Sequence, residues 1–208
     1  MNERQRDGRG LSRRTFLGGL GASTVVLAGC LGGGTAEGSE SVPVRGDPDA
    51  DVTLEVYEDF MCPHCQTYET ETFPQVQDAY LEPGLIRYEH RDYPFLGSAA
   101  WQASSAVREV YEEYGNDQFW AYKAALMERG GEIETGAPDV FGAVAEEMSL
   151  DAESIQTAAA DRVHDDAAEA DKERGRSLGV NGTPSFVVDG ELMDGQRAAF
   201  ERINEEVQ

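Results

Sequence analysis

The sequence has few cysteines, and this scarcity already excludes two classes of protein. Among its 208 residues only Cys30, Cys62 and Cys65 carry a thiol. Three thiols cannot form the disulfide framework of a small secreted scaffold. A structural zinc site usually takes four cysteine or histidine ligands, and the three histidines are scattered without a second pair at ligand spacing. We therefore expect no metal site.

Basic residues are scarce as well. Lysine and arginine total 17 against 40 aspartates and glutamates, which gives a formal net charge of −23. Such a surface repels nucleic acid and anionic lipid, which excludes a nucleic-acid-binding protein. The acidic excess is spread along the whole chain, as is typical of salt-adapted (halophilic) organisms, in which salt screens the self-repulsion. An ordinary acidic secreted protein is the alternative.

Residues 1–30 have the features of an export signal and not of a folded segment. Arg13 and Arg14 stand directly before an apolar run over residues 16–29, which is too short and too rich in glycine to be a permanent membrane helix. An arginine pair followed by such a run resembles a twin-arginine signal. A disordered basic tail is the alternative, but it leaves the apolar run unexplained.

The apolar run ends at Cys30, in a sequence similar to a lipobox. In a lipobox the cysteine is lipidated and becomes the new N-terminus, whereas at an ordinary cleavage site the cysteine would be incidental. The glycine- and serine-rich residues 31–46 are predicted to be a flexible linker. With a lipid on Cys30, the protein would be anchored at the outer face of the cytoplasmic membrane.

A single folded domain is predicted over residues 47–208. A strand over residues 52–58 leads into a helix, and a second strand follows the stop signal at residues 82–84. The pattern from about residue 97 to 178 is helical throughout and indicates an inserted all-helical module. Strand signals then return at residues 185–188 and 191–193, before a closing helix. This order predicts an α/β fold whose mixed sheet is flanked by helices.

Cys62-Pro63-His64-Cys65 stands between the first strand and its helix. The N-terminus of a helix favours an anion, so Cys62 is the candidate nucleophile and the more buried Cys65 the resolving thiol. An inert cysteine pair, or half of an intermolecular zinc site, is the alternative. Protonated His64 would favour the thiolate and raise the reduction potential, unless it is a solvated side chain with little effect.

Thr183 and Pro184 precede the returning strand, at the end of the motif Gly179 to Pro184. Base rates favour a trans bond, since only about 5–6% of X-Pro bonds are cis. Taken together, the Phe60–Cys65 motif, residues 179–186 and the helical block between them resemble the DsbA-like thioredoxin-fold thiol oxidoreductases. The resemblance covers residues 47–208. It implies a thioredoxin fold with a helical insertion, a cis Pro184, and Thr183 at the edge that receives the substrate.

The same resemblance implies an enzyme that donates a Cys62–Cys65 disulfide to the thiols of exported proteins and needs no other cofactor. A membrane redox partner, which the sequence does not identify, would restore the disulfide. Cys-Pro-His-Cys is the form of strongly oxidising members, which gives Pro63 and His64 a tuning role. A disulfide reductase or isomerase of the same fold, a chaperone-like binding module and a metal-carrying thiol protein are the alternatives.

Two departures from the family pattern bear on the direction of electron flow. Thr183 is also common in isomerase-type and reductant-type relatives. Val56 occupies a position where many thioredoxin-fold enzymes have a buried acid that relays protons. Asp59 and Glu69 are possible substitutes, but both are expected to be solvated.

Overall fold

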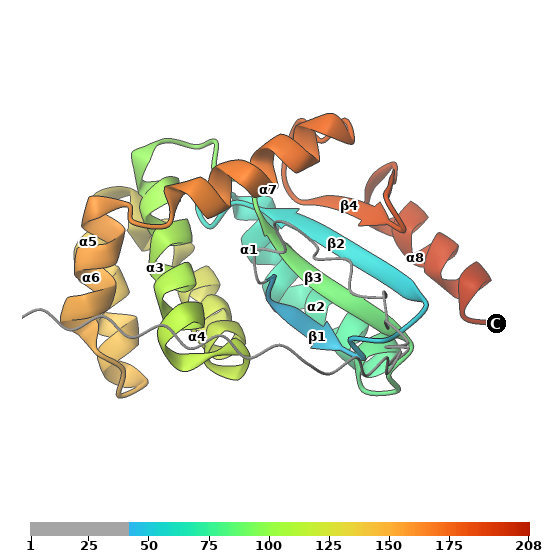
Figure 1. Cartoon of the computed structure of the whole chain (residues 1–208), viewed down its shortest axis with the longest axis horizontal. Helices are drawn as coiled ribbons and strands as arrows, with labels where there is room; N and C mark the ends of the chain where they lie inside the picture. Colours follow the sequence, from blue (N-terminus) through green and yellow to red (C-terminus); the bar gives the residue numbers. More distant parts are fainter. Residues whose placement is uncertain (1–41) are drawn as a thin grey trace, which may run out of the picture. The chain divides into compact units, whose positions relative to one another are not determined.

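A five-stranded sheet forms the centre of the fold (Figure 1), with the strand order β1-β3-β2-β4-β5. The computed structural model describes residues 42–208. Strands β2 (Val52–Glu58) and β3 (Ile86–Asp92) are parallel. The antiparallel pairs add β1 (Val44–Gly46) to β3, β4 (Ser185–Val188) to β2, and β5 (Glu191–Leu192) to β4. The predicted mixed sheet is therefore present.

Strand β1 falls within the residues predicted to be a linker. Val44 pairs with Glu89, and the side-chain amide of Asn116 contacts both the N–H and the carbonyl of Val44, at 3.0 and 2.8 Å. The fold therefore starts before Asp47, because a three-residue edge strand is too short to show alternation in the sequence. The predicted export signal, Cys30 and the linker up to residue 41 lie outside the described residues.

The helical stretch that begins after Cys62 is divided into four segments: α1 (Pro63–Thr67), the π-helical η1 (Tyr68–Thr72), α2 (Phe73–Val76) and the π-helical η2 (Gln77–Leu81). Pro74 lies in the first turn of α2. Proline is accommodated in a first turn because it has no N–H to donate there. The wider π-helical turns before and after α2 accommodate the break that Pro74 makes in the α-helical hydrogen bonding.

The predicted helical module consists of α3 (Ser98–Tyr114), α4 (Asn116–Glu128), α5 (Gly130–Glu147), α6 (Ala152–Asp161) and α7 (Asp165–Ser177). In Figure 1, α3 to α6 form a bundle beside the sheet, and α7 runs from this bundle back to the sheet, where it contacts β3. The closing helix α8 (Gly195–Glu206) packs near β4. No helix between residues 42 and 208 is both long and apolar enough to cross a membrane.

Helix α7 lies directly on the sheet because it carries Gly175 at the contact. A Cβ atom at this position would come within 2.8 Å of the Tyr57 ring and 3.2 Å of the Tyr93 ring. These two tyrosines, with Val180 and Val187, form a small apolar cluster on this side of β2. The larger core fills the other side of the sheet and the interior of the helical block. Both faces of β2 are therefore buried.

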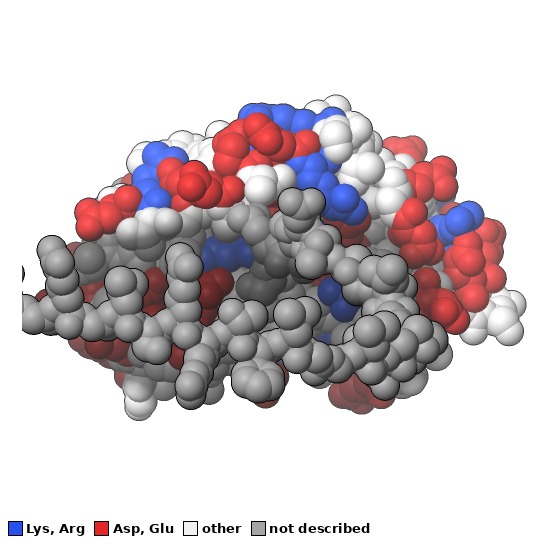
Figure 2. All heavy atoms as spheres, in the orientation of Figure 1, with Lys and Arg blue, Asp and Glu red and all other residues white. Residues whose placement is uncertain are grey.

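Charged side chains on the face shown in Figure 2 gather over α7 and α8, where basic side chains stand among acidic ones. Several of these neighbours form ion pairs, such as Arg176 with Glu169 and Arg202 with Glu206. Between residues 42 and 208, most basic side chains thus pair with acidic neighbours. Acidic residues are in excess over the whole sequence.

Candidate active site

Cys62 lies at the point where β2 has ended and α1 begins. Its backbone is extended (φ −78°, ψ 118°), and Pro63 occupies the first turn of the helix. The carbonyl of Cys62 accepts hydrogen bonds from the N–H groups of Cys65 and Gln66, at 3.0 and 3.1 Å. Cys62 is 4% exposed, and Cys65, one turn into the helix, is completely buried. The expected strand-to-helix position is present.

The two thiols have strongly different tendencies to ionise. The pKa of Cys62 is lowered to about 5, chiefly because the Cys65 thiol donates a hydrogen bond to the thiolate. Burial opposes this effect, while the backbone N–H groups of Cys65 and His64 at the helix N-terminus add to it. Near neutral pH, Cys62 is therefore the thiolate.

Cys65 is shifted in the opposite direction. Burial raises its pKa first, the hydrogen bond to Cys62 raises it further, and the negative charge of Glu58 adds to both. Cys65 therefore remains a thiol while Cys62 is ionised. Two adjacent groups whose pKa values are driven apart can divide the roles of nucleophile and proton carrier.

Thr183 brings a distant part of the chain to Cys62. The Thr183–Pro184 bond is cis, as the family resemblance implied. The Cys62 sulfur lies 3.3 Å from the Thr183 carbonyl oxygen, although 121 positions separate them in the sequence. The two motifs singled out in the sequence therefore meet at one place, at the end of β2 where β4 begins.

Pro63 and His64 are both exposed on α1. Pro63 starts the helix, and the backbone N–H of His64 faces the Cys62 sulfur and lowers its pKa. The orientation of the backbone thus gives His64 an effect on Cys62 that does not depend on its ring. The influence of the imidazole stays a prediction.

Comparison with known proteins assigns this arrangement to a family, because the family model for thioredoxin matches residues 39–205. The chain belongs to the thioredoxin family. Disulfide bond formation protein D of Bacillus subtilis is 24% identical over 169 residues, which cover 80% of this chain and 75% of that protein.

Solved structures share the fold. The crystal structure of oxidised BdbD from Bacillus subtilis superposes with a TM-score of 0.73 at 23% identity, over 80% of this chain and 92% of that one. A thioredoxin-like oxidoreductase from Silicibacter pomeroyi gives a TM-score of 0.63 at 28% identity, over 79% and 91% of the two chains. The fold is therefore that of thioredoxin with an inserted helical block.

A buried cluster of charges near Cys65, which sequence analysis missed, is centred on Glu58. Glu58 and Lys123 are both fully buried, with carboxylate and ammonium 2.9 Å apart. The same Glu58 oxygen lies 3.1 Å from Nδ1 of His90, and Lys123 also pairs with Glu69. Burial raises the pKa of Glu58, but Lys123 and His90 outweigh it and hold that pKa below its usual range. Glu58 is therefore an anion close enough to act on Cys65.

This cluster changes the expectation for the buried acid of the thioredoxin family. Val56 supplies no acid, but Glu58, two residues later, is a fully buried carboxylate. Asp59 and Glu69 were expected to be solvated, and this is wrong, because they are only 1% and 7% exposed. The sequence signal was Lys123, one of only two lysines in the chain, which stands among the apolar residues of a helix.

A series of buried hydrogen bonds and ion pairs leads from Glu58 through His90 to the contact between α7 and β3. His90 Nε2 lies 3.3 Å from Asp92, and Asp92 lies 2.6 Å from Arg108 of α3. Arg108 also pairs with Asp171 of α7. Burial lowers the pKa of His90, but the carboxylates of Asp92 and Glu58 outweigh it, so the pKa is raised and the charged form of the ring is favoured. This charge ladder, which consists of Glu58, His90, Asp92, Arg108 and Asp171, links the sheet to α3 and α7.

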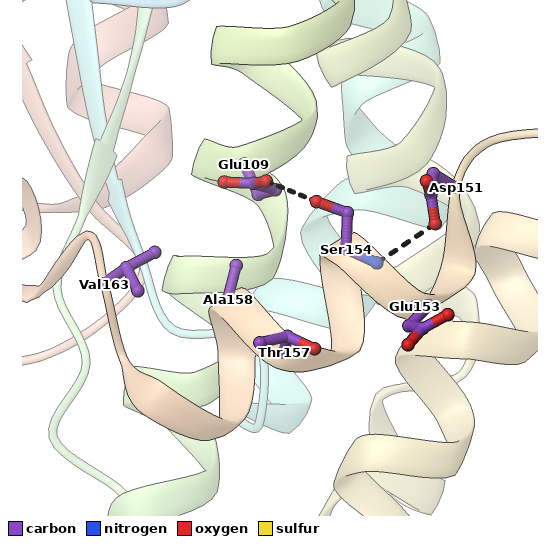
Figure 3. A pocket seen from close by; sticks show the side chains of 7 residues that line it. All are labelled: Glu109, Asp151, Glu153, Ser154, Thr157, Ala158 and Val163. Atoms are coloured by element: carbon purple, nitrogen blue, oxygen red, sulfur yellow. Dashed lines mark hydrogen bonds between the residues drawn. The ribbon is translucent and has the colours of Figure 1, made fainter.

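A separate hollow of about 470 Å³ lies between α3 and α6 (Figure 3). Two of its carboxylates are already engaged, since Glu109 accepts a hydrogen bond from the Ser154 hydroxyl and Asp151 accepts one from the Ser154 N–H. None of the residues predicted for the site lines it. The chemistry is therefore concentrated at Cys62 and not in this hollow.

Proposed function

We propose that the protein is a thiol–disulfide oxidoreductase that oxidises the dithiols of exported proteins through a Cys62–Cys65 disulfide. The observation that carries the proposal is the opposite shift of the two cysteine pKa values beside the Thr183 carbonyl. A stabilised thiolate favours the reduced pair, and this makes the disulfide a strong oxidant. The name of the Bacillus subtilis relative, a disulfide bond formation protein, supports the same chemistry.

The reaction starts from the disulfide form. A thiolate of the substrate attacks the Cys62 sulfur, the Cys62–Cys65 bond breaks, and Cys65 leaves with the electron pair and takes up a proton. The second substrate thiol, after losing its proton, attacks the substrate sulfur of the mixed disulfide. Cys62 then leaves as a thiolate, so two electrons have passed from the substrate to the protein. The low pKa of Cys62 makes it a good leaving group in this last step.

The surroundings of the two sulfurs fit these steps. Cys65 is fully buried, so the proton it takes up is retained, and the fixed negative charge of Glu58 disfavours its thiolate. The Thr183 carbonyl lies 3.3 Å from the Cys62 sulfur. An extended substrate chain that paired with the Thr183 backbone would therefore hold its cysteine near Cys62. No cofactor other than the cysteine pair is required by this sequence of steps.

We assign the reaction to the outer face of the cytoplasmic membrane. The twin-arginine-like segment and the lipobox-like Cys30 support export and lipid anchoring, and an oxidising compartment allows a disulfide to persist. A membrane redox partner would restore the Cys62–Cys65 disulfide after each turnover. Replacement of Cys30 with serine is expected to release the protein from the membrane fraction. If the variant and the wild type fractionate alike, Cys30 is not the anchor.

The reduction potential tests the direction of electron flow. Equilibration of the reduced protein with glutathione in high salt should give a value near −120 mV, as for strong oxidants, whereas a value near −270 mV would indicate a reductase. The Cys62→Ser/Cys65→Ser variant should lose all dithiol oxidation. If this variant retained the full biological activity, a binding role of the chaperone type would replace the enzymatic one.

A further inference from the structure

The direction of β1 shows where the chain enters the fold. Strand β1 is antiparallel to β3, and Gly46 at its end pairs with Arg87, near the start of β3. Before the start of β1, the carbonyl of Pro43 accepts the N–H of His90 at 3.2 Å, in the second half of β3. Strand β2 is parallel to β3 and leads to Cys62. The chain therefore enters the fold at the end of the sheet that carries Cys62.

An aromatic contact connects this entry point with the cysteine turn. The ring centroids of His90 and Phe60 are 5.9 Å apart, and Phe60 stands two residues before Cys62. Pro43, His90 and Phe60 thus form a short series of neighbours that ends beside Cys62. The opposite end of the sheet is distant from it, because the 7 residues of β2 span about 20 Å.

Side chains of α3 and α4 fix the entry point. The side-chain amide of Asn116 binds both the N–H and the carbonyl of Val44, and the indole N–H of Trp120 donates to the same carbonyl at 3.1 Å. The hydroxyl of Tyr111 donates to the carbonyl of Val42 at 3.4 Å. Two helices therefore fasten a strand of only 3 residues.

Loss of these contacts would move the entry point. The first residue after β1 is Asp47, whose N–H donates to the carbonyl of Ile86 at 3.2 Å, at the start of β3. This contact lies at the opposite end of the sheet from Cys62. Because a short edge strand makes few backbone hydrogen bonds and can open locally, the place of entry depends on the hold of Asn116 on β1.

The charge of the protein is unsuited to orienting the domain on a membrane. A net charge of −23 is repelled by anionic lipid. At about 1 M salt the screening length is only about 3 Å, so a charged patch has no effect at longer range. The point at which an anchored chain enters the domain therefore decides which end of the domain is near the membrane.

We propose that β1, held by the positioning residue Asn116, presents Cys62 to the membrane and so to a membrane-embedded partner that carries a reactive disulfide. The inference rests on the proposed function and on the lipid at Cys30. Twelve steps along the chain separate Cys30 from Val42, which span at most about 43 Å, or about 20 Å if the predicted linker is a coil. Entry at the opposite end of the sheet would add about 20 Å, as much as the coil itself spans.

The reaction with this partner restores the disulfide. The Cys62 thiolate attacks one sulfur of the partner's disulfide, and the partner's other sulfur leaves with the electron pair and takes up a proton. Cys65 loses its proton and attacks the Cys62 sulfur, which releases the partner's remaining sulfur as a thiolate. Two electrons have then passed to the partner, and the Cys62–Cys65 disulfide is formed again.

Moving the anchor tests the inference, because the C-terminus lies at the other end of the sheet. Residues 206–208 line a hollow together with Val52, the first residue of β2, and Figure 1 marks the C-terminus on the far side of the sheet from α1. In the test variant, Cys30 is replaced with serine and a membrane-spanning helix is fused after Gln208 through a copy of residues 31–41. In the matched control, the same helix replaces residues 1–30.

The first measurement is the distance of Cys62 from the membrane surface. A fluorophore is attached to Cys62, which reacts selectively because its pKa is low and Cys65 is completely buried. Each protein is placed in phosphatidylcholine vesicles with nitroxide-labelled headgroups, with the domain outside. The nitroxide should quench the fluorescence of the wild type and of the matched control, but not that of the test variant.

The second measurement is the rate at which the reduced cysteine pair is reoxidised in membranes of the cells that make each form. The test variant should be about tenfold slower than the wild type, because the effective concentration of a partner falls when the linker cannot span the added distance. Oxidised glutathione diffuses freely and should reoxidise all three forms at the same rate.

Asn116→Ala should weaken the quenching and slow the reoxidation in membranes, while the rate with glutathione stays unchanged. The amide of His90, which is bound to Pro43, should also exchange its hydrogen faster in this variant. Asn204→Ala is the matched control. Asn204 also accepts a hydrogen bond, from the Tyr80 hydroxyl at 3.3 Å, but it lies on α8. This control should behave as the wild type in both membrane measurements.

The outcomes separate the inference from the function on which it rests. If no form oxidises a dithiol in solution, the proposed function fails, and if Cys30→Ser stays in the membrane fraction, the anchor fails; the inference falls with either. If the function and the anchor hold but the test variant is quenched and reoxidised like the wild type, the inference alone is overturned. Unchanged quenching in Asn116→Ala overturns the role of Asn116.

Discussion

Glu58 and Lys123 form an ion pair of 2.9 Å in which neither side chain reaches solvent. The pair joins the end of β2 to α4, and so connects the sheet that carries Cys62 with the inserted helical block. Charges taken out of water are stable only when their partners remain in place. The pair therefore has consequences for stability as well as for the ionisation of Cys65.

We expect Lys123→Met to destabilise the protein by about 3–5 kcal/mol, because the buried carboxylates of Glu58 and Glu69 lose their shared cation. Urea unfolding measures this loss. The matched control is Arg197→Met, since Arg197 is also paired, with Glu201 at 3.5 Å, but its side chain is 91% exposed. This control should leave the midpoint almost unchanged. Equal losses in both variants would contradict the importance of the buried pair.

The thiolate of Cys62 should titrate with a midpoint near 5 in the reduced protein, well below the ordinary value of about 8.5 for a free cysteine. The ultraviolet absorbance of the thiolate, or the pH dependence of alkylation, measures it. Cys65→Ala should raise the midpoint, because the hydrogen bond from the Cys65 thiol is the largest cause of the shift. A midpoint above 8 in the wild type would rule out the assigned nucleophile.

The same shift makes the stability of the reduced protein depend on pH. Between the folded value near 5 and the unfolded value near 8.5, the unfolded chain binds the proton that the folded chain has released. The stabilisation is therefore complete above about pH 8.5 and is lost as the pH falls through about 5. The oxidised protein has no titrating thiol at this position, so the unfolding free energy of the reduced form relative to the oxidised form should rise with pH across this interval.

Replacing His64 with leucine should lower the reduction potential and raise the pKa of Cys62, because a protonated imidazole favours the thiolate. Equilibration with glutathione provides the measurement. The backbone N–H of His64 remains in the variant, so only the effect of the ring is removed. An unchanged potential would mean that the helix N-terminus and Cys65 are sufficient without the imidazole.

Raising the salt concentration from about 0.1 M to about 1 M should increase the thermal unfolding midpoint, since the screening length falls from about 10 Å to about 3 Å and the net charge of −23 is shielded. The loss caused by Lys123→Met should change little over the same range, because buried pairs are screened much less. A midpoint that falls with salt would argue against salt adaptation.

The sequence predicts the parts of the site that depend on local pattern or on the family resemblance. The strand before Cys62, the start of α1 at Pro63 and the helical block are recognisable within short windows. The meeting of Cys62 with Thr183 came from the resemblance alone, because 121 positions separate them in the sequence and no periodicity connects them.

The buried charges could not be predicted in this way. Glu55 and Glu58 both stand in β2, and sequence analysis predicted neither of them as a buried charge. Both are buried because the partners that neutralise them come from distant helices: Arg174 of α7 lies 2.7 Å from Glu55, and Lys123 of α4 lies beside Glu58. Without the tertiary arrangement, a glutamate in a strand is expected to face water.

The charge ladder from Glu58 to Asp171 also limits which substitutions this protein can accept during evolution. Each member contacts two neighbours, as Arg108 contacts Asp92 and Asp171, so a single replacement removes a counter-charge from two buried groups at once. Related chains should therefore keep the ladder intact or replace several members together. Correlated substitutions at these positions would be the sign of such joint replacement. The exposed pairs of α8, in contrast, are free to vary one residue at a time.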